Sequence, residues 1–205
     1  MKVGGERKVQ DRTLAMRARV LDAALECLVE KGYAATTTIE VTKRAGVSRG
    51  AQLHHFPTKA ELLTAAVQHL LERRITEFRD AVARMDGDGD LLETGVDLLW
   101  SMFQGPAFVA WVELWIAART DADLAASVMA MDERFTVETR AMFVELYATG
   151  VEASAALFDI GRDFTFALME GVALQRLVPR GQRPPEEYID VLKRMLRVLR
   201  DEPRP

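Results

Sequence analysis

Residues 37–63 read TTIEVTKRAGVSRGAQLHHFPTKAELL, and the fold of the chain follows from this stretch. Thr37 and Glu40 form a T-x-x-E capping box, whose hydroxyl and carboxylate satisfy unpaired backbone amides at the start of a helix. The box predicts a short helix that ends at about Ala45, because Gly46 supplies a left-handed turn residue there. The stretch therefore begins with one short helix and a glycine turn.

A second short helix is expected after the turn. Ser48 can cap its start, and the helix must stop near Phe56 because Pro57 disfavours helical backbone in the residue before it. Thr58 and Glu61 then form another capping box, which opens a long helix. Two short helices joined by a glycine turn have the spacing of a helix-turn-helix, a motif that places its second helix in the major groove of DNA.

Helical spacing continues through the rest of the chain, and apolar residues nowhere alternate with period two over strand length. We therefore predict an all-α fold of about nine helices. Outside the motif, the expected helices cover about residues 14–31, 59–82, 91–104, 106–119, 121–147, 160–178 and 185–200. Residues 85–90 (MDGDGD) break the pattern. Their spacing is similar to that of a calcium loop, but Leu91 stands where such a loop needs glycine, so we interpret them as a solvated turn.

The composition is that of an ordinary globular protein, with 49% hydrophobic and 28% charged residues. No apolar run reaches the ~18 residues of a membrane span, and no hydrophobic block follows the basic residues at the N-terminus. We therefore expect neither a membrane segment nor a secretion signal. Cys27 is the sole cysteine and lies in an apolar helical pattern, which favours a small buried residue in a reducing cytoplasm over a disulfide or a reactive thiol.

Charge is distributed unevenly along the chain, whose net charge is −4. Residues 1–60 hold 11 basic and 6 acidic residues, a balance of +5, whereas residues 61–205 hold 16 and 25, a balance of −9. A basic N-terminal part joined to an acidic remainder favours a phosphate-binding module attached to a different domain. The sequence has no nucleophile elbow, phosphate loop or H-E-x-x-H motif and only three histidines, so an enzyme, a metal site and a cofactor are not expected.

Residues 17–63 resemble the DNA-binding region of the TetR family of transcriptional regulators, over 47 residues in register. The positions that carry the resemblance are Gly32-Tyr33, Thr36-Thr37, Ala45-Gly46-Val47-Ser48, Gly50, His54-His55-Phe56 and Lys59. The remaining chain matches the family in helical style and length. The resemblance implies that residues 1–58 form a helix-turn-helix domain, with residues 1–10 as a flexible tail, and that residues 59–205 form an effector-binding and dimerisation domain.

The resemblance also places contacts to a double-stranded DNA operator on the second helix of the motif and at neighbouring helix ends. The implied positions are Thr37, Arg49, Gly50, Ala51, Leu53, His54, His55 and Lys59, and we add Ser48 and Gln52 as further candidates. Arg49 is the best base reader, because its guanidinium reaches guanine O6 and N7 together; a solvated surface arginine is the alternative. Thr37, His55 and Lys59 would hold phosphates without reading sequence. His54 and His55 can alternatively serve in packing.

Three positions depart from the family pattern. Leu53 replaces a tyrosine whose hydroxyl contacts the DNA backbone, and it can instead meet a thymine methyl group. Gln52 stands where an apolar residue normally packs inward, and our hypothesis is that it rotates outward and reads adenine. Ile39 replaces a residue that is usually polar and sometimes reaches DNA. A TetR-like regulator that binds another protein instead of DNA is therefore the second function to test.

TetR-like proteins pair through their last two long helices, which implies a homodimer through residues 160–178 and 185–200, although core packing alone gives the same apolar pattern. The densest aromatic region is interpreted either as packed core or as a pocket for a small apolar or aromatic effector. Its candidate residues are Trp100, Phe103, Gln104, Phe108, Trp111, Glu113, Trp115, Phe143 and Glu170. The resemblance implies a cytoplasmic repressor, associated with the nucleoid when DNA-bound, that the effector releases from its palindromic operator.

Overall fold

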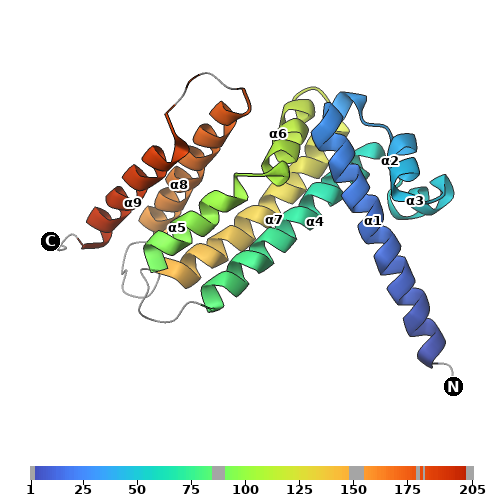
Figure 1. The fold of residues 1–205 in the computed structure, drawn as a ribbon, viewed down its shortest axis with the longest axis horizontal. Coiled ribbons are helices and arrows are strands. Elements are labelled where there is room, and N and C mark those ends of the chain that lie inside the picture. The colour runs from blue at the N-terminus through green and yellow to red at the C-terminus, as the bar shows by residue number, and fades with distance from the viewer. Residues whose placement is uncertain (1–2, 85–90, 148–154, 179–180, 182, 202–205) are drawn as a thin grey trace. The chain divides into compact units, whose positions relative to one another are not determined.

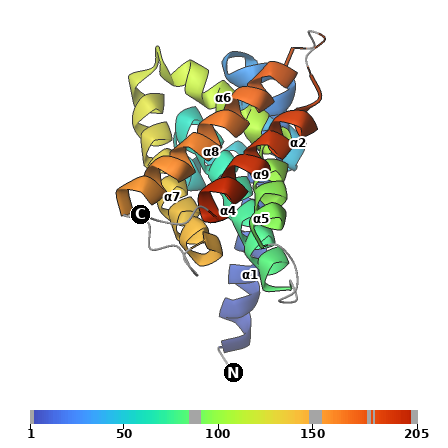
Figure 2. The same ribbon diagram turned by 90° about the vertical axis from the view of Figure 1, so that its left-hand side faces the viewer.

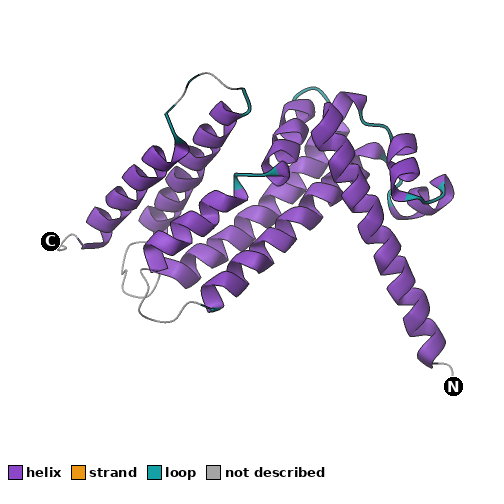
Figure 3. Cartoon of the chain, viewed as in Figure 1, coloured by secondary structure: helices purple, strands orange, loops and turns teal. Residues whose placement is uncertain are grey.

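The computed structural model describes residues 3–84, 91–147, 155–178, 181 and 183–201, and these residues form nine helices joined by loops, with no strand among them (Figure 3). The prediction of an all-α fold is confirmed. In chain order (Figure 1) the helices are α1 (Val3–Ala35), α2 (Thr38–Ala45), α3 (Arg49–His55), α4 (Lys59–Ala83), α5 (Leu91–Met102), α6 (Pro106–Ala118), α7 (Ala122–Tyr147), α8 (Ala155–Arg176) and α9 (Pro185–Asp201). The turn expected at residues 85–90 lies outside the described part of the chain.

Several helix ends differ from the sequence pattern. α1 begins at Val3, so residues 3–10, expected as a flexible tail, belong to a helix. α1 also extends past Gly32, where φ 74° and ψ 172° interrupt the helical backbone. α5 ends at Met102, because the next two amides donate to carbonyls three residues back and close a tighter turn. α8 begins at Ala155, before the expected start.

The chain divides into two compact units. Unit 1 comprises Met1–Glu72 and Val109–Glu133, and unit 2 comprises Arg73–Phe108 and Arg134–Pro205. Helices α4, α6 and α7 each contribute residues to both units. The two compact units therefore do not meet at residue 58. The division of the chain at that residue into a DNA-binding part and an effector-binding part remains a prediction.

Unit 1 has a single apolar core to which distant parts of the sequence contribute. Leu21 and Leu28 of α1, with Leu63 of α4, are at most 1% exposed. Leu114 of α6 and Leu124 of α7 are fully buried in the same core. Each buried leucine contributes about 1.5–3 kcal/mol to stability. The segment formed by α6 and the first half of α7 is therefore part of the frame that holds the helix-turn-helix.

In unit 2, α8 and α9 lie side by side, as both Figure 1 and Figure 2 show. Leu192 of α9 is fully buried. Two cations of α9 pair with carboxylates of α5: Lys193 with Asp97 at 2.6 Å, and Arg197 with Glu93. These contacts fix which face of α9 is turned toward its own unit.

Candidate DNA-binding surface

The turn between α2 and α3 is fixed by hydrogen bonds between residues close in sequence. Gly46 adopts the left-handed conformation, with φ 65° and ψ 39°. The N–H of Val47 donates to the carbonyl of Thr42 at 3.1 Å, which is the Schellman arrangement that ends a helix. Ser48 then caps α3, because its hydroxyl accepts from the N–H of Ala51 at 3.2 Å. The helix-turn-helix predicted from the sequence is present.

One of the two predicted capping boxes forms completely. The N–H of Thr58 donates to Glu61 Oε2, and the N–H of Glu61 donates to Thr58 Oγ1, both at 3.1 Å. At α2 the N–H of Glu40 donates to Thr37 Oγ1 at 3.3 Å, but the Glu40 carboxylate pairs with Lys31 of α1. The first box is therefore half formed, because the Glu40 carboxylate pairs with Lys31 instead of accepting a hydrogen bond from the backbone N–H of Thr37.

Helix α3 presents one face to solvent. Its exposed residues are Arg49, Gly50, Leu53 and His54, which are neighbours on one side of a helix. Ala51 and His55 are half-buried, and the rings of His54 and His55 meet edge to face at 5.2 Å. The opposite side of α3 is anchored by Phe56, the residue that ends the helix, which is 5% exposed. Arg49 therefore stands in solvent at the first position of a helix that is held in place from behind.

The hypothesis that Gln52 rotates outward is wrong. Gln52 is 1% exposed, and its side-chain amide donates from Nε2 to the carbonyl of Phe56 at 2.6 Å. Gln52 thus occupies the inward position at which an apolar residue was expected, and it satisfies a carbonyl at the end of α3. Its Oε1 atom is buried without a partner in the described structure. Its inward position removes Gln52 from the residues proposed to contact DNA.

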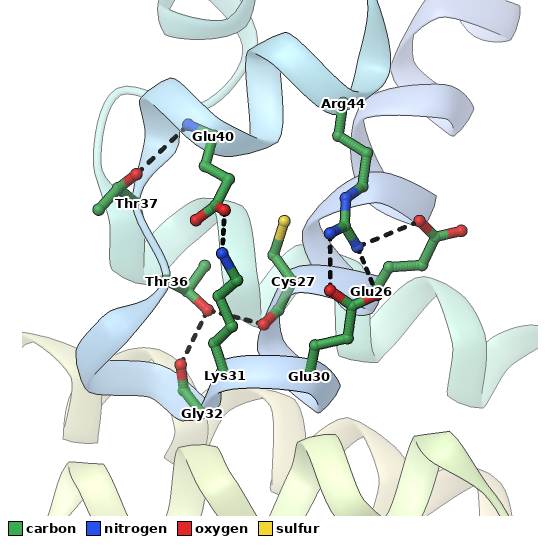
Figure 4. A network of polar contacts seen from close by, with 9 residues as sticks. All are labelled: Glu26, Cys27, Glu30, Lys31, Gly32, Thr36, Thr37, Glu40 and Arg44. Atoms are coloured by element: carbon green, nitrogen blue, oxygen red, sulfur yellow. Dashed lines mark hydrogen bonds and ion pairs between the residues drawn. The ribbon is translucent and has the colours of Figure 1, made fainter.

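A polar network joins α2 to α1 (Figure 4). The guanidinium of Arg44 donates to both carboxylate oxygens of Glu30, at 2.8 and 2.6 Å, and to Glu26 at 3.4 Å. The hydrogen bond from Arg44 lowers the pKa of Glu30. Thr36 Oγ1 donates to the carbonyl of Cys27 at 3.0 Å. Cys27 is fully buried, as predicted, and burial raises the pKa of its thiol. Arg44 therefore holds α2 against α1 through its hydrogen bonds to the two glutamates.

Lys59, at the start of α4, lies over an aromatic ring. Its Nζ is 4.3 Å from the centre of the Tyr33 ring and donates to the carbonyl of Ala34 at 3.4 Å. The Tyr33 hydroxyl donates to Asp121 Oδ2 at 3.3 Å. Burial lowers the pKa of Lys59, while burial and then the charge of Asp121 raise the pKa of Tyr33. An ammonium group has three N–H donors, so Lys59 could contact a phosphate with those that do not meet the Tyr33 ring or the Ala34 carbonyl.

Glu113 of α6, predicted as an effector-binding residue, contacts the end of α1. Its Oε2 atom accepts a hydrogen bond from the backbone N–H of Tyr33 at 3.2 Å. The same oxygen would lie 2.7 Å from a Cβ atom placed on Gly32, so only glycine fits there without displacing the carboxylate. The sequence offered no signal for the contacts of Tyr33 with Glu113 and Asp121, because they join residues 80 and 88 positions apart.

The remaining effector candidates fall into two groups. In unit 1, Trp111 and Trp115 donate their indole N–H groups to the two oxygens of Asp132, at 2.8 and 2.6 Å, and their rings are 4.9 Å apart. In unit 2, the candidates Trp100, Phe103, Phe108 and Phe143 are buried. Phe166 of α8, which is not among the candidates predicted from the sequence, has its ring within 6.1 Å of those of Phe103, Phe135 and Phe143. Gln104 is exposed and Glu170 half-buried.

Among the residues that the structure describes, no group of three or more His, Cys, Asp or Glu side chains is arranged to hold a metal ion. No described helix is both long and apolar enough to cross a membrane.

The sequence profile described as "Bacterial regulatory proteins, tetR family" matches residues 20–66, which hold the helix-turn-helix. The HTH-type transcriptional regulator CymR of Pseudomonas putida is 31% identical to the chain over 192 residues, covering 93% of this chain and 92% of that protein. The HTH-type transcriptional regulator BetI of Stenotrophomonas maltophilia is 32% identical over 125 residues, covering 58% of this chain and 62% of that protein.

Solved structures show the same fold. A putative TetR-family transcriptional regulator from Rhodococcus sp. superposes with a TM-score of 0.73 at 22% identity, over 91% of this chain and 98% of that one. FadR from Bacillus subtilis, solved in complex with stearoyl-CoA, superposes with a TM-score of 0.63 at 14% identity, over 91% and 98%. With the helix-turn-helix in place and a relative 31% identical along nearly the whole chain, the protein belongs to the TetR family of bacterial transcriptional regulators.

Proposed function

We propose that this regulator is a repressor that binds a palindromic operator as a homodimer and is released from it by a small apolar or aromatic effector. The observation that carries the DNA-binding part is the face of α3, on which Arg49 and His54 stand exposed while Gln52 and Phe56 anchor the helix from the other side. A helix held in this way can enter the major groove without rearranging its own packing.

The exposed residues divide by the contacts that their chemistry allows. Arg49 reads guanine, and Leu53, which is 41% exposed, meets a thymine methyl group. Thr37, His55 and Lys59 hold phosphates and set the register. The remaining proposed contacts come from α3 and its cap, where small or polar residues let the DNA backbone approach: Ser48, Gly50, Ala51 and His54. We place the functional boundary near residue 58, where α4 begins.

Selection of bound duplexes from a randomised DNA pool tests this function. The purified chain is expected to enrich a palindrome with half-sites about 34–36 Å apart, one turn of the double helix, because each protomer offers one α3. Affinity for the enriched duplex should fall steeply as salt is raised, since phosphate contacts release counterions. If no sequence is enriched even at low salt, the DNA-binding proposal fails.

A regulator that binds another protein is the second candidate, and a specific observation favours it. Ile39 of α2 and Leu53 of α3 are large apolar residues that are 64% and 41% exposed on the helix-turn-helix. Exposed apolar side chains of this size are typical of protein interfaces as well as of contacts to thymine methyl groups. Weak binding to DNA with no sequence preference, together with a shallow salt dependence, would favour this second function.

The homodimer is proposed from an apolar surface on α8, the two residues that follow it, and α9. Its exposed residues are Ile160, Phe164, Leu174, Leu177, Val178, Val191, Met195 and Val198. On α9, Val191, Met195 and Val198 follow helical spacing on one stripe, whereas Leu192 packs into its own unit. Because a twofold axis pairs a surface with its own copy, two such pairs of helices can cover one another.

Introducing charges on this stripe is expected to separate the protomers. The double variant Val191→Glu/Met195→Glu should weaken the dimer by about 100-fold or more, because twofold symmetry would bring four carboxylates into an apolar interface. Sedimentation velocity of the variant and of the wild type over a range of concentrations measures this change. Val137→Glu is the matched control, since Val137 of α7 is 63% exposed in the same unit but lies outside the proposed interface. Equal dissociation of both variants would contradict the interface.

The effector is proposed to bind in unit 2, where the buried aromatic residues gather. FadR from Bacillus subtilis, a protein of the same fold, was solved with stearoyl-CoA, a ligand that carries a long apolar acyl chain. In this chain the buried rings favour a compact ring compound. The repressor would act in the cytoplasm, where DNA and the effector are both accessible to it.

A further inference from the structure

Six aromatic side chains of unit 2 form a cluster, which we call the unit-2 aromatic cluster: Trp100, Phe103, Phe108, Phe135, Phe143 and Phe166. The Trp100 ring is stacked on that of Phe103, with centres 6.4 Å apart and planes 16° from parallel. Phe103 in turn meets Phe166 edge to face at 5.7 Å. The six rings thus form one connected set of aromatic contacts, drawn from α5, the turn that follows it, α6, α7 and α8.

The indole nitrogen of Trp100 is a donor without an acceptor. Trp100 is 6% exposed, and its Nε1 has no hydrogen-bond partner in the described structure. The other two indoles of the chain, those of Trp111 and Trp115, both donate to Asp132. The great majority of buried hydrogen-bond donors in proteins have an acceptor, because an unpaired donor loses its hydrogen bond to water and gains none in return. The orphaned N–H therefore requires an explanation.

No described group accepts from Trp100 Nε1, the buried threonine hydroxyls of the same unit included. Thr139 donates to the carbonyl of Phe135 at 2.8 Å, and Thr165 donates to the carbonyl of Gly161 at 2.9 Å. Both threonines are thus bonded within their own helices, and both are at most 3% exposed. An acceptor that reaches Trp100 from outside the protein would form a hydrogen bond without breaking one.

We propose that the Trp100 N–H is the polar contact by which the unit-2 aromatic cluster selects its ligand, and that the ligand is a neutral ring compound with one hydrogen-bond acceptor such as a ketone. The proposal rests on the effector part of the proposed function and names its chemistry. The ligand is neutral because all six side chains of the cluster are uncharged, and the guanidiniums of Arg140, Arg162 and Arg197 in this unit already pair with Asp159, Asp163 and Glu93. A buried carboxylate would need such a cation.

Matched pairs of small molecules test this ligand class. Indane and 1-indanone have nearly the same shape but differ in one carbonyl acceptor, as do the larger fluorene and 9-fluorenone. Calorimetric titration of the full-length chain without DNA is expected to show tighter binding of each ketone than of its hydrocarbon, by about tenfold, the value of one satisfied buried donor. Indane-1-carboxylate is the charged member of the series and should bind more weakly than 1-indanone.

The variant Trp100→Phe isolates the hydrogen bond from the change in ring size. Ring size affects ketone and hydrocarbon alike, so the ratio of their affinities should fall to about one only if the N–H is the recognising group. Trp115→Phe, which removes a half-exposed indole of unit 1, is the matched control and should leave the ratio unchanged. Circular dichroism melting shows whether each variant is folded.

A measurement on the unaltered chain covers the case in which Trp100→Phe does not fold. In protein labelled with ¹⁵N-tryptophan, the indole resonance that remains in the spectra of both Trp111→Phe and Trp115→Phe belongs to Trp100. In the unaltered chain this resonance should shift when 1-indanone is added and should not shift when indane is added. Equal affinities for ketone and hydrocarbon, a ratio retained in Trp100→Phe, tighter binding of the carboxylate, or no binding of any probe would each overturn the proposal. Because DNA is absent, these outcomes are separate from the result of operator selection.

Discussion

Replacing Arg49 with alanine is expected to lower the affinity for the selected operator by about 100-fold or more while leaving the fold intact. A bidentate contact from arginine to guanine contributes about 1–3 kcal/mol, and a symmetric dimer makes the contact twice. Arg49 is exposed at the first position of α3, and its side chain supports none of the packing that holds the helix. The loss should therefore appear in DNA binding and not in the melting temperature.

The measurement compares wild type, Arg49→Ala and Lys43→Ala on the selected duplex and on a duplex of scrambled sequence. Lys43 is an exposed cation of α2, so its loss should weaken both complexes by similar factors if it acts only through charge. Arg49→Ala should weaken mainly the specific complex and relax the preference at one base pair of each half-site. If both variants weaken the two complexes equally, Arg49 does not read bases.

Replacing Gly32 with alanine is expected to destabilise the protein by about 2–4 kcal/mol, the largest stability effect of a single added methyl group that the structure indicates. The backbone at φ 74° and ψ 172° lies in a region that is essentially restricted to glycine and costs another residue about 1–3 kcal/mol. The added Cβ would also approach Glu113 Oε2 to 2.7 Å. The carboxylate must then withdraw and lose its hydrogen bond to the Tyr33 amide, at a further cost of about 1 kcal/mol.

Urea unfolding of Gly32→Ala, with Gly46→Ala as the control, separates these contributions. Gly46 also has positive φ, but an added Cβ there meets no atom within 4 Å, so only a conformational cost of about 1–2 kcal/mol is expected. In a Glu113→Ala background the cost of Gly32→Ala should fall, since the contact with the carboxylate is already gone. An unchanged cost of Gly32→Ala in the Glu113→Ala background would show that Glu113 plays no part.

The helix-turn-helix was predictable because the interactions that define it are local. The Ser48 cap, the left-handed Gly46 and the reciprocal bonds of Thr58 and Glu61 all join residues within a few positions of one another. Patterns of residue type at fixed spacing carry this information directly. The Glu40 carboxylate is the exception, because it pairs with Lys31 of α1 instead of completing the cap of α2.

For a related reason, the sequence could not show which of the predicted effector residues belong to unit 1 and which to unit 2. Trp100 and Trp111 belong to the same aromatic stretch, yet Trp111 donates to Asp132 in unit 1 whereas Trp100 is buried in unit 2 without a partner. Spacing along α5 and α6 reports that these positions are apolar and helical. It does not report which neighbour each ring meets, because the neighbours come from α7 and α8.

By itself the sequence determined the helical class, the helix-turn-helix and the basic N-terminal part that together indicated a DNA-binding regulator. Tertiary structure alone decided that Gln52 turns inward, that Glu113 supports the end of α1 through Tyr33, and that the Trp100 indole is left unpaired. The difference has one physical cause. Caps and turns are satisfied within one or two turns of helix, whereas a buried polar group takes whichever partner the packing of distant helices places beside it.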